Sequence, residues 1–217
     1  MADQDSRTGA RYATRELIDY VDRVHAAHDP ALARAFAAPD QHDMPAIQVG
    51  ASEGKTLTLL MRLIGARNVV EVGTLAGYSA LRLIAGLAPG GKLWTFELEP
   101  KHAQVARDNF AAAGVADRVE VRVGAALSGL RAIESEGPFD AMFIDADKAG
   151  YADYARWGQR NLRPGGLLLG DNAYFFGDLL GNKPGAAQMR EFHEFVAQHF
   201  DSVCLPTPDG VVVAIRR

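Results

Sequence analysis

Two short polar segments contain the side chains best suited to chemistry. Asp145 and Lys148 lie in the segment Asp-Ala-Asp-Lys, and Asp171 and Asn172 lie in Gly-Asp-Asn. Each segment follows an apolar run that predicts a buried strand. If the two strands are neighbours, about 4.8 Å apart, the side chains at their ends can converge. Carboxylate and amide oxygens suit Mg²⁺, Mn²⁺ or Ca²⁺ rather than zinc, so the pattern is compatible with a divalent metal site. The spacing is equally compatible with two ordinary loop caps.

A glycine loop is the second candidate site. The sequence VVEVGTLAGYS predicts a strand that contains Glu71, a turn with Gly73 and Gly77, and then a helix. Such a turn lies at the carboxyl end of a strand, where glycine lets the backbone approach a ligand and the helix presents free N–H groups. The dinucleotide fingerprint requires glycine at positions 75 and 78, but the chain has Leu75 and Tyr78. The remaining pattern, acid-x-Gly-x-x-x-Gly, resembles the cofactor loop of S-adenosylmethionine-dependent methyltransferases.

Strands and helices alternate after this loop, which predicts a parallel, doubly wound α/β sheet. Glu97 closes the second strand, where a carboxylate can accept hydrogen bonds from both ribose hydroxyls of an adenosine; a helix cap or a solvated acid is the alternative. The later strands are expected at Lys92 to Glu97, Arg118 to Val123, Phe139 to Asp145 and Leu167 to Gly170, and the helices at about 100–113, 126–135 and 151–162. The segment Arg163-Pro-Gly-Gly is expected to turn into the fifth strand.

The carboxyl-terminal part departs from this alternation. After a helix at about 186–200, two extended runs, Ser202 to Leu205 and Gly210 to Ile215, are separated by only Pro-Thr-Pro-Asp. A connection this short cannot make a parallel crossover, so the last two strands must be antiparallel. The expected fold is therefore a mostly parallel seven-stranded sheet that ends in an antiparallel hairpin, as in methyltransferases and generally not in dehydrogenases.

Extra helices are expected before the first strand. A helix from about Arg11 to His28 has a loose apolar stripe, and Asp29-Pro30 ends it and starts a second short helix. Ser52 could cap a further helix that runs to about Gly65. We expect one domain, with residues 1–43 as a helical cover over the sheet, a pocket mouth or a partner subunit, and residues 44–217 as the catalytic core. The stripe consists of Tyr12, Leu17, Ile18, Tyr20, Val21 and Val24.

Composition excludes several classes of protein. The chain has 217 residues, 48% apolar and 23% charged, with a net charge of -4 and scattered basic residues, so no nucleic-acid groove is expected. No apolar run is long enough for a signal peptide or a membrane span, and a single cysteine, Cys204, fits a reducing cytoplasm. Glu-Gly-Lys-Thr at 53–56 lacks the first glycine of a P-loop, because Val49 stands there. The six histidines form no pattern and are assigned to surfaces.

Most of the chain, from about Met44 onward, resembles the cation-dependent O-methyltransferases of the catechol and caffeoyl-CoA type, as found in bacteria. The motifs that carry the resemblance are EVGTLAGYSA, FELEP, FDAMFIDADKAGY, LRPGGLLLGDN and PTPDGVVVAIRR. The resemblance implies a Rossmann-like methyltransferase fold, S-adenosylmethionine as cofactor, a divalent metal and a small aromatic diol as acceptor. It implies that Asp145, Asp171 and Asn172 bind the metal, and that the cofactor contacts Val49, Glu71, Gly73, Thr74, Ser79, Glu97, Ala126 and Asp147.

The implied chemistry explains the need for these residue types. A phenol with a pKa near 10 is a poor nucleophile at neutral pH. A divalent ion that chelates two adjacent hydroxyls would stabilise the phenolate and orient it toward the methyl group. Lys148 matches the lysine that catechol-type enzymes use at the acceptor hydroxyl, and it could take the proton or only stabilise the phenolate. A surface lysine is the alternative.

Several readings stay open at the level of sequence. The family often has Trp after the Asp-Asn pair, whereas this chain has Tyr174, Phe175 and Phe176, which could form an acceptor wall, a lid, core packing or dimer packing. We expect a homodimer that methylates an ortho-dihydroxy aromatic. The alternatives are a methyltransferase with a different acceptor and a non-catalytic S-adenosylmethionine-binding protein. An N-methyltransferase is disfavoured, because Asp-Ala-Asp-Lys replaces its usual Asp/Asn-Pro-Pro motif.

Overall fold

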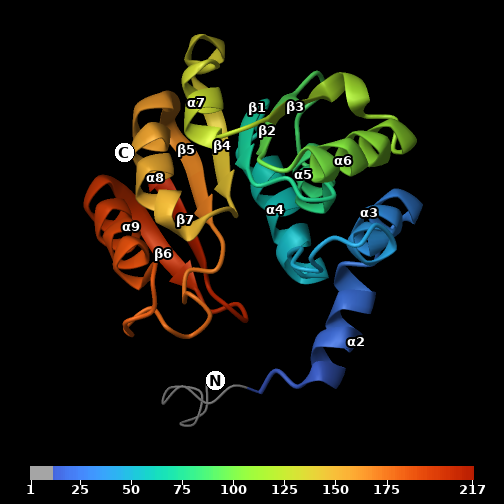
Figure 1. Ribbon diagram of the computed structural model, residues 1–217, viewed down its shortest axis with the longest axis horizontal. Helices are drawn as coiled ribbons and strands as arrows, with labels where there is room; N and C mark the ends of the chain where they lie inside the picture. Colours follow the sequence, from blue (N-terminus) through green and yellow to red (C-terminus); the bar gives the residue numbers. More distant parts are fainter. Residues whose placement is uncertain (1–11) are drawn as a thin grey trace.

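A seven-stranded sheet forms the centre of the protein in the computed structural model, which describes residues 12–217 (Figure 1). Its strand order is β3-β2-β1-β4-β5-β7-β6. The first five strands are parallel, while β7 is antiparallel to both β5 and β6, which confirms the expected terminal hairpin. The strands are β1 (Asn68–Val72), β2 (Lys92–Glu97), β3 (Val119–Val123), β4 (Phe139–Ile144), β5 (Leu162–Gly170), β6 (Phe200–Leu205) and β7 (Val211–Arg216).

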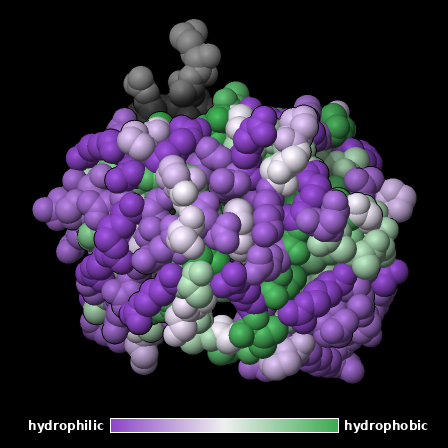
Figure 2. Space-filling view, turned by 90° about the horizontal axis from the view of Figure 1, so that it is seen from above, coloured by the Kyte–Doolittle hydropathy of each residue, from purple (hydrophilic) through white to green (hydrophobic). Residues whose placement is uncertain are grey.

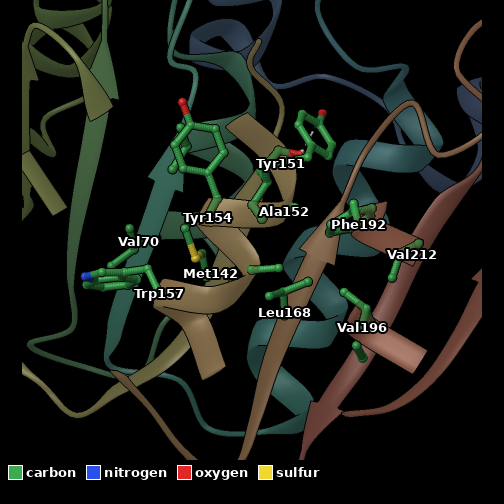
Figure 3. Packing of buried hydrophobic residues seen from close by; sticks show 14 of the residues in the cluster. Val70, Met142, Tyr151, Ala152, Tyr154, Trp157, Leu168, Phe192, Val196 and Val212 are labelled. Atoms are coloured by element: carbon green, nitrogen blue, oxygen red, sulfur yellow. Dashed lines mark hydrogen bonds between the residues drawn. The ribbon is translucent and has the colours of Figure 1, made fainter. Parts of the chain in front are cut away.

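Helices cover both faces of the sheet. In Figure 1, α8 and α9 lie on one side, and α4, α5 and α6 lie on the other. Strand residues alternate between the two layers. Met142 packs in the cluster formed with α8 and α9 that Figure 3 draws, and Ile144 belongs to the same cluster. Ala141 and Phe143 pack instead with α4 and α5. The helices are α2 (Arg15–His25), α3 (Pro30–Gln41), α4 (Ala51–Leu63), α5 (Tyr78–Ile84), α6 (Pro100–Ala112), α7 (Ala126–Arg131), α8 (Tyr151–Asn161) and α9 (Ala186–His199).

Three local predictions need correction. Ser52 does not cap α4, because the helix begins at Ala51 and the Glu53 carboxylate accepts the Gly50 N–H at 2.9 Å, closing the turn from inside the helix. Strand β5 already begins at Leu162, with a register shift against β4, so Arg163-Pro-Gly-Gly lies within the strand rather than in a turn before it. Helix α7 ends at Arg131, earlier than expected.

The amino-terminal helix α2 leaves its apolar stripe uncovered. Thr14 caps the helix by accepting the Leu17 N–H, and no residue of α2 is buried. Leu17, Tyr20 and Val24 are each more than half exposed, although α2 contacts α4. Arg11, the expected first residue of this helix, lies outside the described residues. Within the protein as described, the stripe therefore covers neither the sheet nor a pocket mouth.

The remaining surface is mixed. The face drawn in Figure 2 is mainly hydrophilic, with apolar side chains in smaller groups between polar ones. Over residues 12–217, none of the helices combines the length and the apolar character needed to cross a lipid bilayer.

Candidate active site

The two polar segments meet at the carboxyl edge of the sheet. Ile144, the last residue of β4, is paired with Gly170, the last residue of β5, so Asp145 and Asp171 follow neighbouring positions. The Asp171 N–H continues the pairing by donating to the Ile144 carbonyl at 2.9 Å. The two strands are therefore neighbours, as convergence of the two segments required, and because they are parallel their carboxyl ends lie at the same edge.

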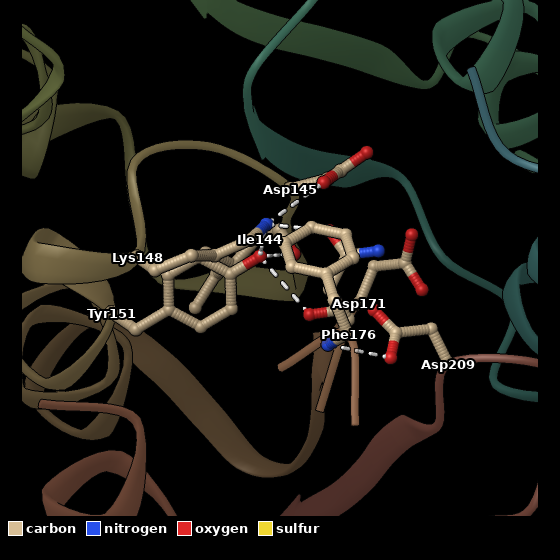
Figure 4. A network of polar contacts seen from close by, with 8 residues as sticks. Ile144, Asp145, Lys148, Tyr151, Asp171, Phe176 and Asp209 are labelled. Carbon is tan, nitrogen blue, oxygen red and sulfur yellow. Dashed lines mark hydrogen bonds and ion pairs between the residues drawn. The ribbon is translucent and has the colours of Figure 1, made fainter. Parts of the chain in front are cut away.

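Lys148 joins the two segments (Figure 4). It begins a single turn of 3-10 helix, Lys148–Gly150, that directly precedes α8. Its ammonium donates to Asp145 Oδ1 at 3.3 Å, to Asn172 Oδ1 at 2.5 Å and to the hydroxyl of Tyr151 at 2.7 Å. A side-chain cation is thus held between an acid from one segment and an amide from the other, so these oxygens are arranged to hold positive charge.

Burial disfavours the ionised form of both acids at this edge. Burial raises the pKa of Asp145, and the ammonium of Lys148 opposes that rise. Burial, followed by the charge of Asp145, raises the pKa of Asp171 to about 7. Buried carboxylates with raised pKa values fit an additional cation. Among residues 12–217 there is no group of three or more His, Cys, Asp or Glu side chains that could hold a metal. The predicted metal ligands are of a different composition, since Asp145 and Asp171 provide two carboxylates and Asn172 provides an amide oxygen.

A cavity of about 660 Å³ runs from this edge along the glycine loop. Asp145, Lys148 and Asn172 line one part of it. Most of the predicted cofactor residues also line it, namely Val49, Gly73, Thr74, Ser79, Glu97, Ala126 and Asp147. Asp171 instead lines a smaller neighbouring cavity of about 50 Å³, which shares Val49 with the first.

Glu71 lies behind the wall of the large cavity. Its side chain is fully buried and accepts hydrogen bonds from the hydroxyls of Ser79 and Thr95, each at 2.6 Å. Thr74 extends this network through a 2.6 Å contact with Thr95. Burial raises the pKa of Glu71 to about 8, although both hydroxyl hydrogen bonds lower it. Without a ligand, Glu71 is therefore mostly protonated near neutral pH.

Replacing Glu71 with glutamine is expected to remove a pH dependence of folding. Below pH 4.5, the ordinary pKa, both folded and unfolded chains carry the proton. Between that value and about 8, the unfolded chain releases the proton while the folded chain retains it, so the free energy of unfolding falls as pH rises. Over this window the wild type should lose several kcal/mol more than Glu71→Gln, because each pKa unit corresponds to about 1.4 kcal/mol. Denaturant unfolding of both proteins at pH 5 and pH 8 without ligand gives the two free energies of unfolding. If the free energy changes equally with pH in wild type and Glu71→Gln, the prediction is wrong.

Glu97 organises the turn of the glycine loop. Its Oε2 accepts the N–H groups of Thr74 and Leu75 at 3.1 and 2.8 Å, and its Oε1 accepts that of Glu99 at 3.0 Å. His102 lies 3.6 Å from Oε1 and lines the cavity. A contact of Glu97 with a ribose stays a prediction.

The assignment of all histidines to surfaces is wrong. His102 lines the cavity, and its position on α6 next to the Glu97 loop depends on tertiary packing that no sequence pattern revealed. His28 is part-buried against the Tyr78 hydroxyl at 2.8 Å. His193 makes a 2.8 Å hydrogen bond to the carbonyl of Ala173.

Two tyrosines of α8 were missed in the sequence. Tyr154 donates to Asp147 Oδ1 at 2.6 Å, and the other oxygen of Asp147 accepts the Gly150 N–H at 2.9 Å. Tyr151 contacts Lys148. The spacing Lys-x-x-Tyr-x-x-Tyr places both rings on one helical face, and this i, i+3 relation was the available signal.

The aromatic segment 174–176 divides between core and cavity. Phe175 is 8% exposed and packs in the core, whereas Phe176 is 66% exposed and lines the cavity, with the Lys148 ammonium 6.0 Å from its ring centroid. Both residues have φ in the left-handed region, at 52° and 54°. The Phe176 N–H donates to Asp209 Oδ1 at 2.9 Å, which ties this turn to the β6–β7 hairpin (Figure 4).

Comparisons with known proteins identify the family of the chain. The family model described as O-methyltransferase matches residues 24–217. A catechol O-methyltransferase of Mycobacterium tuberculosis is 46% identical over 207 residues, which cover 91% of this chain and 94% of that protein.

Similar solved structures are also O-methyltransferases. An O-methyltransferase of Bacillus cereus in complex with SAH superposes with a TM-score of 0.89 at 37% identity, covering 93% of this chain and 97% of that one. The O-methyltransferase TomG of Streptomyces achromogenes, in complex with SAM, has a TM-score of 0.87 at 32% identity and covers 99% of each chain. The chain belongs to the O-methyltransferase family and is an enzyme of methyl transfer.

Proposed function

We propose that this protein is a divalent-metal-dependent O-methyltransferase that uses S-adenosylmethionine (SAM) to methylate one hydroxyl of an ortho-dihydroxy aromatic. The observation that carries the proposal is the convergence of Asp145, Asn172 and Lys148 at one part of the cavity along the glycine loop. The relative named catechol O-methyltransferase supports the acceptor class. The relatives in complex with SAH and SAM support the cofactor.

SAM fits the residues of the large cavity. The glycine loop offers backbone close to the ligand, and Glu97 offers a carboxylate for hydroxyl groups. Glu71 lies behind Ser79, and a SAM ammonium near that wall would favour the ionised form of this acid. Asp147, held by Tyr154 and by the Gly150 N–H, offers a second oriented carboxylate. When bound, SAM supplies a methyl group on a sulfonium sulfur.

The same edge fits a divalent ion, with Asp145, Asp171 and Asn172 as the residues that would hold it. Their hard oxygens, the raised pKa values of the two acids and the ammonium already held there all favour a cation. When bound there, such an ion would lower the pKa of a chelated hydroxyl and fix its orientation. Lys148 lies beside these oxygens and holds or receives a proton at the acceptor hydroxyl.

Release of S-adenosylhomocysteine (SAH) tests the proposal. The purified chain is assayed with SAM and a panel that contains catechol, 3,4-dihydroxybenzoate and phenol, with Mg²⁺ or with EDTA. We expect turnover of the two diols with Mg²⁺ and none of phenol, because only adjacent hydroxyls chelate. Turnover that EDTA leaves unchanged would reject the metal. SAM binding without turnover of any diol would favour a different acceptor or a non-catalytic protein.

We also propose a homodimer that buries the stripe of α2. Leu17, Tyr20, Val21 and Val24 form an exposed apolar surface on one helix, and such a surface is commonly covered by a partner. The chain mass is 23.4 kDa, so sedimentation equilibrium of a dimer should give twice that molar mass. Val24→Glu is expected to shift the protein toward the monomer, because it places a charge in the contact. Leu180→Glu, at an 89% exposed leucine away from α2, is the matched control and should leave the dimer intact. A wild-type monomer would reject the proposal.

A further inference from the structure

The hydroxyl of Tyr151 connects Lys148 to the backbone of both strand ends. It accepts the Lys148 ammonium at 2.7 Å and donates to the Asp171 carbonyl at 3.0 Å, with the Ile144 carbonyl at 3.3 Å (Figure 4). A tyrosine hydroxyl has one proton and two lone pairs, so it can make both kinds of contact at once. The carbonyls of Ile144 and Asp171 thus fix the direction of the lone pair that faces the ammonium.

The tyrosine itself is held rigidly. Its side chain is fully buried, and its ring packs edge to face against Phe192 with centroids 5.3 Å apart. Burial raises the pKa of Tyr151 well above its ordinary value, so the hydroxyl stays neutral. The Lys148 ammonium also lies 4.7 Å from the ring centroid, a distance at which a cation is attracted to the ring face.

The other two partners of Lys148 are different in kind. Asp145 and Asn172 are proposed metal ligands, so their oxygens serve a second cation as well. Tyr151 is the hydrogen-bond partner of Lys148 that is not a proposed metal ligand. A lysine has a flexible four-carbon stem. Without a hydrogen-bond partner reserved for it, its ammonium can move away from the part of the cavity where the methyl-accepting substrate would bind.

We propose that Tyr151 is a positioning residue, which holds the Lys148 ammonium where the acceptor hydroxyl reacts. This inference rests on the proposed role of Lys148. Tyr151 touches no ligand in this scheme, since it does not line the cavity. Lys148 is the side chain of the site that its hydroxyl contacts, and its contacts with Ile144 and Asp171 are to backbone carbonyls. Loss of the Tyr151 hydroxyl should therefore affect turnover rather than the affinity for SAM.

Tyr154 is the natural contrast. It lies on the same face of α8, yet its hydroxyl donates to Asp147, a predicted cofactor residue. Tyr154→Phe is expected to raise the KM for SAM, whereas Tyr151→Phe is expected to lower kcat. Each substitution removes one tyrosine hydroxyl, so a difference between the two variants distinguishes an effect on SAM binding from an effect on Lys148.

The test is a double-mutant cycle with Tyr151→Phe, Lys148→Met and the double variant, assayed with SAM, Mg²⁺ and 3,4-dihydroxybenzoate. Removing the hydrogen bond to a charged group should lower kcat about 10-fold or more. SAM affinity, measured by calorimetry, should stay within about twofold. In the Lys148→Met background, Tyr151→Phe should cause no further loss. Circular dichroism and Tm establish that each variant is folded.

A second readout does not depend on turnover. In the free protein, acetylation of Lys148 by acetic anhydride, followed by mass spectrometry, should be faster in Tyr151→Phe than in the wild type, because the ammonium is no longer held. An unchanged labelling rate, an unchanged kcat, or equal losses with and without Lys148 would each overturn the inference. If Lys148→Met itself keeps the wild-type kcat, the proposed role of Lys148 fails instead.

Discussion

Asp145→Asn is expected to lower kcat for a diol acceptor by about 10²-fold or more, because a bound divalent ion contributes several kcal/mol and each 1.4 kcal/mol corresponds to a factor of ten. Asparagine keeps the size and one oxygen but removes the negative charge. Asp145 is the acid that joins β4 to the site, where it contacts Lys148 and influences the pKa of Asp171. The variant should need much more Mg²⁺, and saturating Mg²⁺ should restore its kcat only in part.

The measurement is kcat as a function of Mg²⁺ concentration, with EDTA-treated wild type as the reference for complete loss. Asp153→Asn is the matched control, since Asp153 is an exposed acid of α8 that pairs with Arg156 at 2.9 Å, and its kcat should equal that of the wild type. Equal Mg²⁺ profiles for wild type and Asp145→Asn would contradict the assignment.

Stability separates this effect from misfolding. Burial raises the pKa of Asp145, so the ionised carboxylate lowers the stability of the folded chain when no metal is bound. Asparagine has no such charge, and Lys148 retains its contacts with Tyr151 and Asn172. The Tm of the metal-free variant is therefore expected not to fall, although activity is lost. A large drop in Tm would make the kinetic result uninformative about the metal.

The positions of Asp145 and Asp171 could be predicted from sequence because they depend on a rule of topology. Parallel strands end at the same edge, so acids that directly follow two neighbouring strands lie at the same edge of the sheet. The terminal hairpin was predictable for a similar reason, since four residues cannot cross a sheet. Both predictions needed only strand positions and connection lengths, which the apolar runs and turn residues indicate.

Other features depend on side-chain direction and could not be read from the pattern. Glu71 was predicted as a cofactor contact, but it lies behind Ser79, and its partner Thr95 comes from the neighbouring strand β2. His102 reaches the cavity through the packing of α6. Phe175 and Phe176 are chemically identical neighbours, and only the left-handed turn sends one into the core and the other to the cavity.

Gly73→Ala is expected to lower Tm by roughly 10 °C. A β-carbon at this position would lie 1.9 Å from the carbonyl oxygen of Asp145, and φ is +94°, in the left-handed region. Neither neighbour can easily move, because the Gly73 N–H donates to Phe96 of β2 and the Asp145 N–H donates to Val72 of β1. The strained φ costs about 1–2 kcal/mol and the overpacking about 1–3 kcal/mol, and each 1 kcal/mol lowers Tm by about 2–4 °C in a chain of this size.

Gly90→Ala isolates the cost of the strained φ, so its difference from Gly73→Ala gives the contribution of overpacking. Gly90 has a similar φ of +76°, but no atom lies within 4 Å of an added β-carbon. It should lose only a few degrees of Tm, because it has the strain without the clash. The two variants should also differ in catalysis at a temperature where both are folded. The clash in Gly73→Ala pushes on the backbone of Asp145 itself, so kcat should fall there and not in Gly90→Ala. Equal Tm and equal kcat for the two variants would mean that the glycine loop and the acid at the end of β4 are not mechanically linked.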